Sequence, residues 1–122
     1  MTMSAEHILQ QAGDALIYAD QQGIIRVWNA AAERLFGFTA GEAIGQSLDL
    51  IVPEKLRAAH WRGFDAAMAS GQTKHAGKPT RTKALTKAGE VIYAEMSFAL
   101  VKDEASGEMG SVAMARLSPT PQ

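Results

Sequence analysis

The chain of 122 residues contains no cysteine and no long apolar run. The absence of cysteine excludes disulfide bonds, thiolate nucleophiles and cysteine-ligated zinc. The longest apolar stretches, such as residues 97–101, are far too short to cross a bilayer, and the N-terminal segment lacks the basic and apolar regions of a signal peptide. We therefore expect a cytoplasmic protein with no membrane segment.

The charges also lack a strong excess of either sign. The chain has 12 Lys and Arg residues against 13 Asp and Glu residues, a formal net charge of -1. Its basic residues are scattered, which is typical of a solvated surface and not of a phosphate-binding patch. We therefore expect no nucleic-acid partner. Hydrophobic residues make up 47% of the chain, which suits one globular domain with one core.

Capping and turn residues divide the first part of the chain into short elements. The sequence predicts a short helix over residues 4–11 and a β-hairpin over residues 15–28. Asn29 and Thr39 stand where helix N-caps are expected, so each begins a short helix. A longer helix is expected over residues 53–70, because that segment starts on a proline and is followed by a glycine.

Three strands are expected in the second half, at residues 74–85, 90–101 and 108–117. Pro79 has no N–H group, so the first of these strands should lie at a sheet edge. Two strands, several helices and three further strands indicate an α+β fold, with a five-stranded antiparallel sheet and with short helices and one longer helix on one face. The space between sheet and helices is a usual place for a small ligand.

A histidine interrupts the apolar face of the longer helix. Spacings of three and four place five residues on one face that should point towards the sheet: Leu56, His60, Gly63, Phe64 and Ala67. A packing role for His60 would require a hydrogen bond to a backbone carbonyl or a side chain, since an unpaired buried polar group costs about 1 to 3 kcal/mol. A ligand-binding role is the alternative.

A series of motifs marks the first half of the chain: an aspartate-x-x-glycine turn, an asparagine, an AAERLFG helix, a glutamate, an IG pair and a proline-glutamate helix start. The residues that carry these motifs are Asp20, Gly23, Asn29, Ala32, Glu33, Phe36, Gly37, Glu42, Ile44, Gly45 and Pro53. Together they resemble a PAS domain, and the strands of the second half are similar to the rest of that fold.

The resemblance implies a sensory or interaction module and not an enzyme. It covers residues 14–117, which leaves an N-terminal helical arm at residues 1–13 and a tail at residues 118–122. We find no nucleophile-histidine-acid trio and no carboxylate cluster in the sequence, which also argues against catalysis. A homodimer is expected, formed through the segment at residues 4–11 and the outer face of the sheet.

Within the family, the lack of cysteine excludes the flavin-adduct and hydroxycinnamoyl photoreceptors. The segment PEKLRAAH instead resembles the helix of oxygen-sensing haem PAS domains, in which the proximal histidine ends an R-x-x-H pattern. The resemblance places His60 as the axial metal ligand of haem b, with Leu56 and Phe64 beside it. It also places an apolar distal wall on the next-to-last strand, formed by Ile92, Ala94, Met96 and Phe98, which a period of two would likewise gather.

Other positions receive different expectations. The distal arginine of those sensors aligns with Thr80, and Arg81 is expected on the opposite strand face. His75 is expected to be exposed on the edge strand, with a distal role as a minor alternative, and His7 belongs to the arm. Trp61 lies off the buried stripe and is a candidate dimer contact, although partial packing is the more common outcome.

Two functions therefore remain open after the sequence. The first is a haem-based gas or redox sensor in which His60 holds the iron. The second is a cofactor-free interaction and dimerisation module, or a sensor of an organic metabolite bound in the same cavity.

Overall fold

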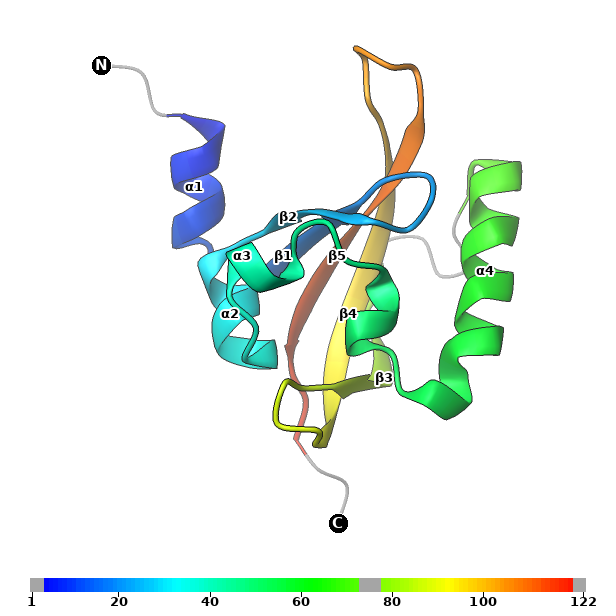
Figure 1. Cartoon of the computed structure of the whole chain (residues 1–122). Helices are drawn as coiled ribbons and strands as arrows, with labels where there is room; N and C mark the ends of the chain where they lie inside the picture. The colour runs from blue at the N-terminus through cyan, green and yellow to red at the C-terminus, as the bar shows by residue number, and fades with distance from the viewer. Residues whose placement is uncertain (1–3, 73–77, 120–122) are drawn as a thin grey trace.

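A computed structural model describes residues 4–72 and 78–119 of the chain. It is an α+β PAS-type fold, as predicted, with a five-stranded antiparallel sheet in the order β2-β1-β5-β4-β3 (Figure 1). The strands are β1 (Ala15–Ala19), β2 (Ile25–Trp28), β3 (Thr80–Leu85), β4 (Val91–Lys102) and β5 (Met109–Leu117). The α-helices are α1 (Ala5–Gln11), α2 (Ala30–Phe36), α3 (Ala40–Ala43) and α4 (Arg57–Ser70). Two 3₁₀ helices, η1 (Leu48–Ile51) and η2 (Glu54–Leu56), precede α4.

The predicted boundaries differ from the structure mainly around the longer helix and the edge strand. The first turn after Pro53 is the 3₁₀ helix η2, and the α-helix begins only at Arg57. The edge position of β3 agrees with the expectation from Pro79. The strand itself begins at Thr80, while the predicted positions 74–77, with His75, lie outside the described residues. Among the described residues, no helix has the length and apolarity to cross a membrane.

The main core lies between α2, α3 and the adjoining half of the sheet. Trp28 and Phe36 are fully buried there with Ile17 and Ile25. The rings of Trp28 and Phe36 pack at a centroid distance of 5.5 Å, and the indole N–H of Trp28 donates to the carbonyl of Phe38 at 2.9 Å. These large apolar side chains fill this half of the molecule. Each fully buried one contributes roughly 1.5–3 kcal/mol to the stability of the fold.

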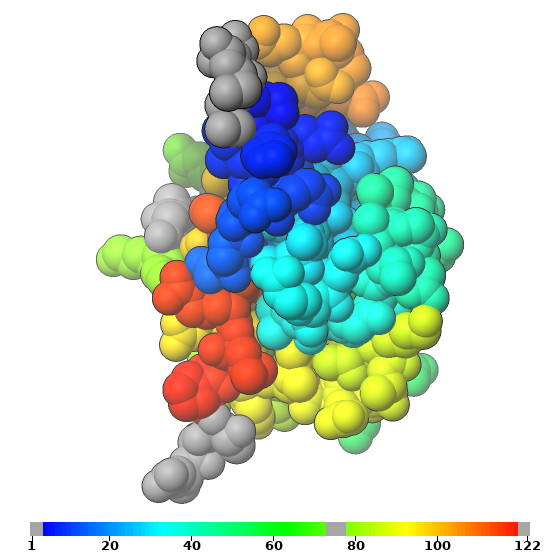
Figure 2. Space-filling model, turned by 90° about the vertical axis from the view of Figure 1, so that its left-hand side faces the viewer, coloured from blue at the N-terminus to red at the C-terminus, as the bar shows by residue number. Residues whose placement is uncertain are grey.

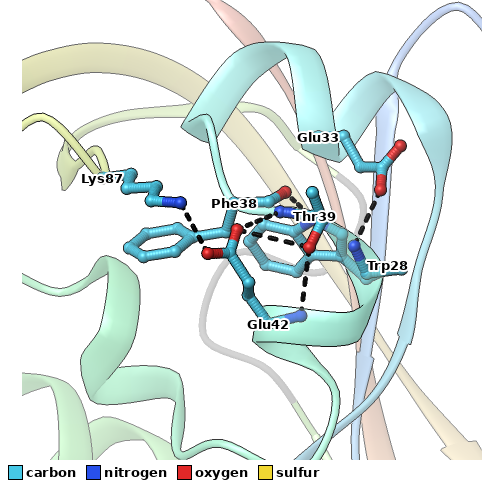
Figure 3. A network of polar contacts seen from close by, with 7 residues as sticks. Trp28, Glu33, Phe38, Thr39, Glu42 and Lys87 are labelled. Carbon is cyan, nitrogen blue, oxygen red and sulfur yellow. Dashed lines mark hydrogen bonds and ion pairs between the residues drawn. The ribbon is translucent and has the colours of Figure 1, made fainter.

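Polar contacts join the α2–α3 segment to the β3–β4 turn (Figure 3). Thr39 and Glu42 form the predicted capping box, in which each side chain accepts from the other residue's backbone N–H. The carboxylate of Glu42 also pairs with the ammonium of Lys87, and the backbone N–H of Lys87 donates to the carbonyl of Phe36 at 2.9 Å. These contacts fasten the α2–α3 segment to the β3–β4 turn and so keep it over the sheet.

The buried side chain of Asn29 joins α1, β1 and α2. Its oxygen accepts from the backbone N–H groups of Leu16 and Ala32, at 2.9 and 3.0 Å. Its amide nitrogen donates to the carbonyls of Leu9 and Asp14, at 2.9 and 3.1 Å. Asn29 is therefore more than the predicted helix cap, because it also fastens the N-terminal helix, which Figure 2 shows lying against α2.

We expect Asn29→Ala to lower the free energy of unfolding by about 2–4 kcal/mol, because four backbone groups lose their partner at a buried position. Urea unfolding followed by circular dichroism measures this loss. The matched control is Gln10→Ala, which removes only an exposed bond to the backbone N–H of Ala30 and should cost less than about 1 kcal/mol. Equal losses in the two variants would contradict the role given to Asn29.

Candidate functional site

A cavity of about 450 Å³ lies between α4 and the inner face of the sheet. Its helix side is formed by His60, Gly63, Phe64 and other residues of the same α4 face, and its sheet side includes Met96 and Phe98. The volume falls within the roughly 300–1,000 Å³ that is typical of small-molecule sites. The cavity is partly open to solvent, since Phe98 at its edge is 37% exposed. Its walls are mainly apolar.

The structure brings together most of the site residues that the sequence predicted. All five members of the predicted helix stripe line the cavity: Leu56, His60, Gly63, Phe64 and Ala67. Met96 and Phe98 line it from β4. Ile92 and Ala94 share their strand face but are not among the lining residues, because they lie nearer the β3–β4 turn and pack in or against the main core.

His60 has an unusual environment in the helix wall. Its Nδ1 atom is buried and has no hydrogen-bond partner among the described residues. Burial lowers the pKa of His60, and the negative charges of Asp49 and Asp65 oppose this shift only in part. Burial thus favours the neutral imidazole, in which one ring nitrogen carries a lone pair. The hydrogen bond that a packing role would require is absent from the described part of the chain.

Gly63 lies one turn after His60 and leaves space in the wall. A Cβ atom at this position would meet no atom within 4 Å. Glycine within a helix costs about 1 kcal/mol relative to alanine, so local stability does not favour it here. Phe64 is the only buried residue of α4, so the helix is not packed closely on the sheet along its length. The wall at Gly63 is therefore open for a bound molecule.

Some parts of the site were not identified from the sequence. Ile17, Leu48 and Ala113 add to the lining from β1, η1 and β5. The sequence of β1 does not alternate between apolar and polar residues, so it could not indicate which side of the strand faces the cavity, although the folded strand buries every second residue. Trp61 is half-buried within the chain, the more common outcome named above, and its role is taken up below.

The remaining polar groups at the site are few. Thr82, Lys83 and Ser111 line the cavity from the sheet. Arg81 does not line it, since its guanidinium lies 4.5 Å from the ring centre of Tyr93 on the outer face, in agreement with the prediction. Residues 4–72 and 78–119 contain no group of three or more His, Asp or Glu side chains that could hold a metal ion. A metal ion bound to His60 would therefore need its other ligands from a cofactor and not from these side chains.

Comparison with known families matches the PAS fold over residues 5–116. The chain belongs to the PAS family and is a PAS sensory module. The PAS domain of a protein from Colwellia psychrerythraea has the same fold, with a TM-score of 0.77 at 20% identity, and the match covers 92% of each chain.

Two curated relatives are named as sensors. The sensor protein FixL of Bradyrhizobium diazoefficiens is 47% identical over 53 residues, which are 43% of this chain and 10% of FixL. The oxygen sensor protein DosP of Escherichia coli is 28% identical over 108 residues, which are 88% of this chain and 13% of DosP. The chain thus spans little more than a tenth of the length of either relative.

We expect His60→Leu to leave the haem-free protein as stable at pH 8 as the parent, or more stable by up to about 2 kcal/mol, because it removes a buried polar atom that has no partner in residues 4–72 and 78–119. Thermal unfolding measures the difference.

The same comparison should depend on pH. In the parent, the folded-state pKa of His60 is lowered from 6.5, so the unfolded chain binds more protons and the parent loses stability as the pH falls below about 6.5. The advantage of His60→Leu should therefore widen on acidification. A clear loss of stability in His60→Leu at pH 8 would mean that the imidazole has a stabilising partner.

Proposed function

We propose that this PAS module binds haem b in the cavity, with His60 as the axial ligand, and that it senses a gas or a redox change. The observation that carries the proposal is an imidazole in an apolar cavity wall, with a buried ring nitrogen that has no partner among the described residues. Histidine is the common protein ligand of b-type haem, and one such ligand is sufficient.

The residues around the cavity suit a large planar apolar group. Phe64 and Met96 supply apolar walls on its two sides, and Gly63 leaves the helix wall open beside His60. The thioether of Met96 adapts to irregular shapes. When bound, haem b would supply an iron atom able to take a diatomic gas or to change its oxidation state. The chain would hold the iron through His60 and exclude water with the apolar walls.

The names of the relatives support a role in sensing, and one of them a role in sensing oxygen. FixL is called a sensor protein and DosP an oxygen sensor protein. The alignment with DosP extends over most of this chain, so the likeness is not confined to one motif. An organic metabolite is the second candidate ligand, favoured by the mainly apolar lining of the cavity. A module that acts without any cofactor is the third.

The first test is an absorption spectrum of the protein purified from cells supplied with haem. We expect a Soret band in the parent that is lost or strongly reduced in His60→Ala, because the axial ligand is removed. His7→Ala is the matched control, since His7 lies on the exposed helix α1, and it should keep the band. A colourless parent, or a band that His60→Ala leaves unchanged, would exclude the proposed ligation and leave the organic metabolite or the cofactor-free module.

A second test fills the open wall instead of removing the ligand. Gly63→Leu should abolish haem uptake, since the new side chain would occupy the cavity beside His60. It should leave the haem-free fold intact or stabilise it by up to about 1 kcal/mol, because leucine is a better helix former than glycine. Ala66→Leu is the control, as Ala66 is an exposed α4 residue that does not line the cavity. Titration with haemin and thermal unfolding separate the two effects.

We also propose that the module is a homodimer that pairs through α1 and the outer face of the sheet. Exposed apolar side chains support this surface: Ile8 on α1 is 59% exposed, while Val101 and Met114 on the outer sheet face are 41% and 40% exposed. Exposed apolar side chains gathered on one face are typical of an interaction surface.

Met114→Glu should shift the protein from dimer to monomer, because a charge would be buried in the interface. Sedimentation velocity measures the change. Val91→Glu is the matched control, because Val91 lies on the same outer sheet face but at the start of β4, away from Met114, and it should have a weaker effect. A parent that sediments as a monomer at high concentration would contradict the dimer.

A further inference from the structure

Trp61 lies beside His60 and contacts its ring. The two ring centroids are 4.7 Å apart with the planes inclined at 76°, an edge-to-face arrangement. Trp61 also meets Phe64 edge-to-face at 5.2 Å. Such aromatic pairs have a preferred geometry, so the orientation of one ring restricts the orientation of the other. The position of the imidazole therefore depends on what holds the indole.

The carboxylate of Asp49 holds one edge of the indole. The Nε1–H group of Trp61 donates to Oδ1 of Asp49 at 2.7 Å. The acceptor carries a charge, so this hydrogen bond is stronger than one between neutral groups. Asp49 is fixed in turn, since the Arg57 guanidinium lies 3.9 Å from the same oxygen and donates to the carbonyl of Val52.

The turn between β1 and β2 receives the other end of the indole. A Cβ atom at Gly23 would lie 2.2 and 2.4 Å from two carbons of the Trp61 ring, so only glycine allows this approach. The φ of Gly23 is +79°, which also favours glycine. The carbonyl of Gly23 accepts from the N–H of Leu48, so the turn and η1 form one support for the indole.

Helix α4 has few other attachments. Phe64 is its only buried residue, and its N-cap has no side-chain hydrogen bond. In Figure 1 the helix runs along one side of the sheet, away from α1 and α2. The cavity occupies the space that core side chains would fill in a helix packed directly on a sheet. The contacts of Trp61 thus help to fix the position of α4, and of His60 on it, relative to the strands.

From these contacts we propose that Trp61 is the positioning residue for His60: clamped between Asp49 and Gly23, the indole fixes the imidazole in the cavity wall. The inference rests on the proposed function only in naming His60 as the ligand of a bound group. The clamp itself consists of contacts within this chain and exists without any ligand.

The first part of the test uses the haem-free protein. The ring current of Trp61 should shift the proton resonances of His60, and nuclear Overhauser effects should join the indole to Gly23. Asp49→Asn weakens the charged hydrogen bond to the indole, so it should alter both signals. Asp65→Asn is the matched control, because the negative charge of Asp65 also acts on His60, whereas the described indole N–H of Trp61 donates to Asp49 and not to Asp65. Equal spectra for Asp49→Asn and the parent would overturn the clamp.

The second part uses the haem-loaded protein. Trp61→Phe and Asp49→Asn should each raise the rate of haem loss about tenfold, in keeping with the loss of one charged hydrogen bond. Each should also shift the iron–histidine stretching frequency of the reduced protein, which a general loss of fold stability would not move. Asp65→Asn should stay close to the parent in both. Unchanged rates and frequencies in both clamp variants would overturn the inference even if haem binds normally.

The two proposals fail in different ways. If the parent takes up no haem, the proposed function fails, and the spectra of the haem-free protein alone decide whether Trp61 positions His60. If haem binds through His60 but the clamp variants behave like the parent, only the positioning role fails. Thermal unfolding of each variant excludes a misfolded protein as the cause, and Asp49→Asn serves if Trp61→Phe does not fold.

Discussion

The buried amide of Asn29 is the interaction on which the arrangement of the helices depends. It stands where the chain leaves the sheet, and its four hydrogen bonds fix the start of α2 relative to α1 and β1. From this point α2 and α3 pack directly on one half of the sheet, closed at their far end by the contact between Glu42 and Lys87. The chain then continues through η1 and η2 to α4, which lies over the other half of the sheet.

The two halves of the inner sheet face are covered differently. Trp28 and Phe36 fill the first half, whereas α4 covers the second with Phe64 as its one buried residue. The difference leaves a cavity in the second half. Two features of α4 are locally unfavourable: a ring nitrogen of His60 that finds no partner in the described part of the chain, and the glycine at position 63. Local features that oppose stability concentrate at functional sites, and here both lie in the cavity wall.

The fold and the helix wall of the site could be predicted because they rest on local signals. The caps at Asn29 and Thr39 are short-range chemistry, and the stripe from Leu56 to Ala67 follows from helix periodicity. The β4 wall was predicted in part. The alternation of β4 predicts correctly which sheet face Ile92 lies on. It does not predict that Ile92 lies too far along the strand to reach the cavity, because tertiary packing sets the position of α4.

The contributions that were missed depend on contacts between distant segments. Trp61 carries no local sign that its indole would reach Asp49 and Gly23, since the second contact spans most of the first half of the chain. Helix periodicity correctly predicts that Trp61 lies off the cavity face, but it cannot predict the contact with the β1–β2 turn. The β1 and β5 parts of the wall become visible only when the strand order is known.

We propose that the space between α4 and the sheet is a binding site in which His60 holds the ligand. A crystal structure of the protein after loading with haem b tests this most directly. The expected result is a macrocycle between α4 and the inner face of β4, with its iron bonded to the imidazole of His60. A macrocycle bound elsewhere, or a cavity closed by movement of α4 onto the sheet, would contradict the claim.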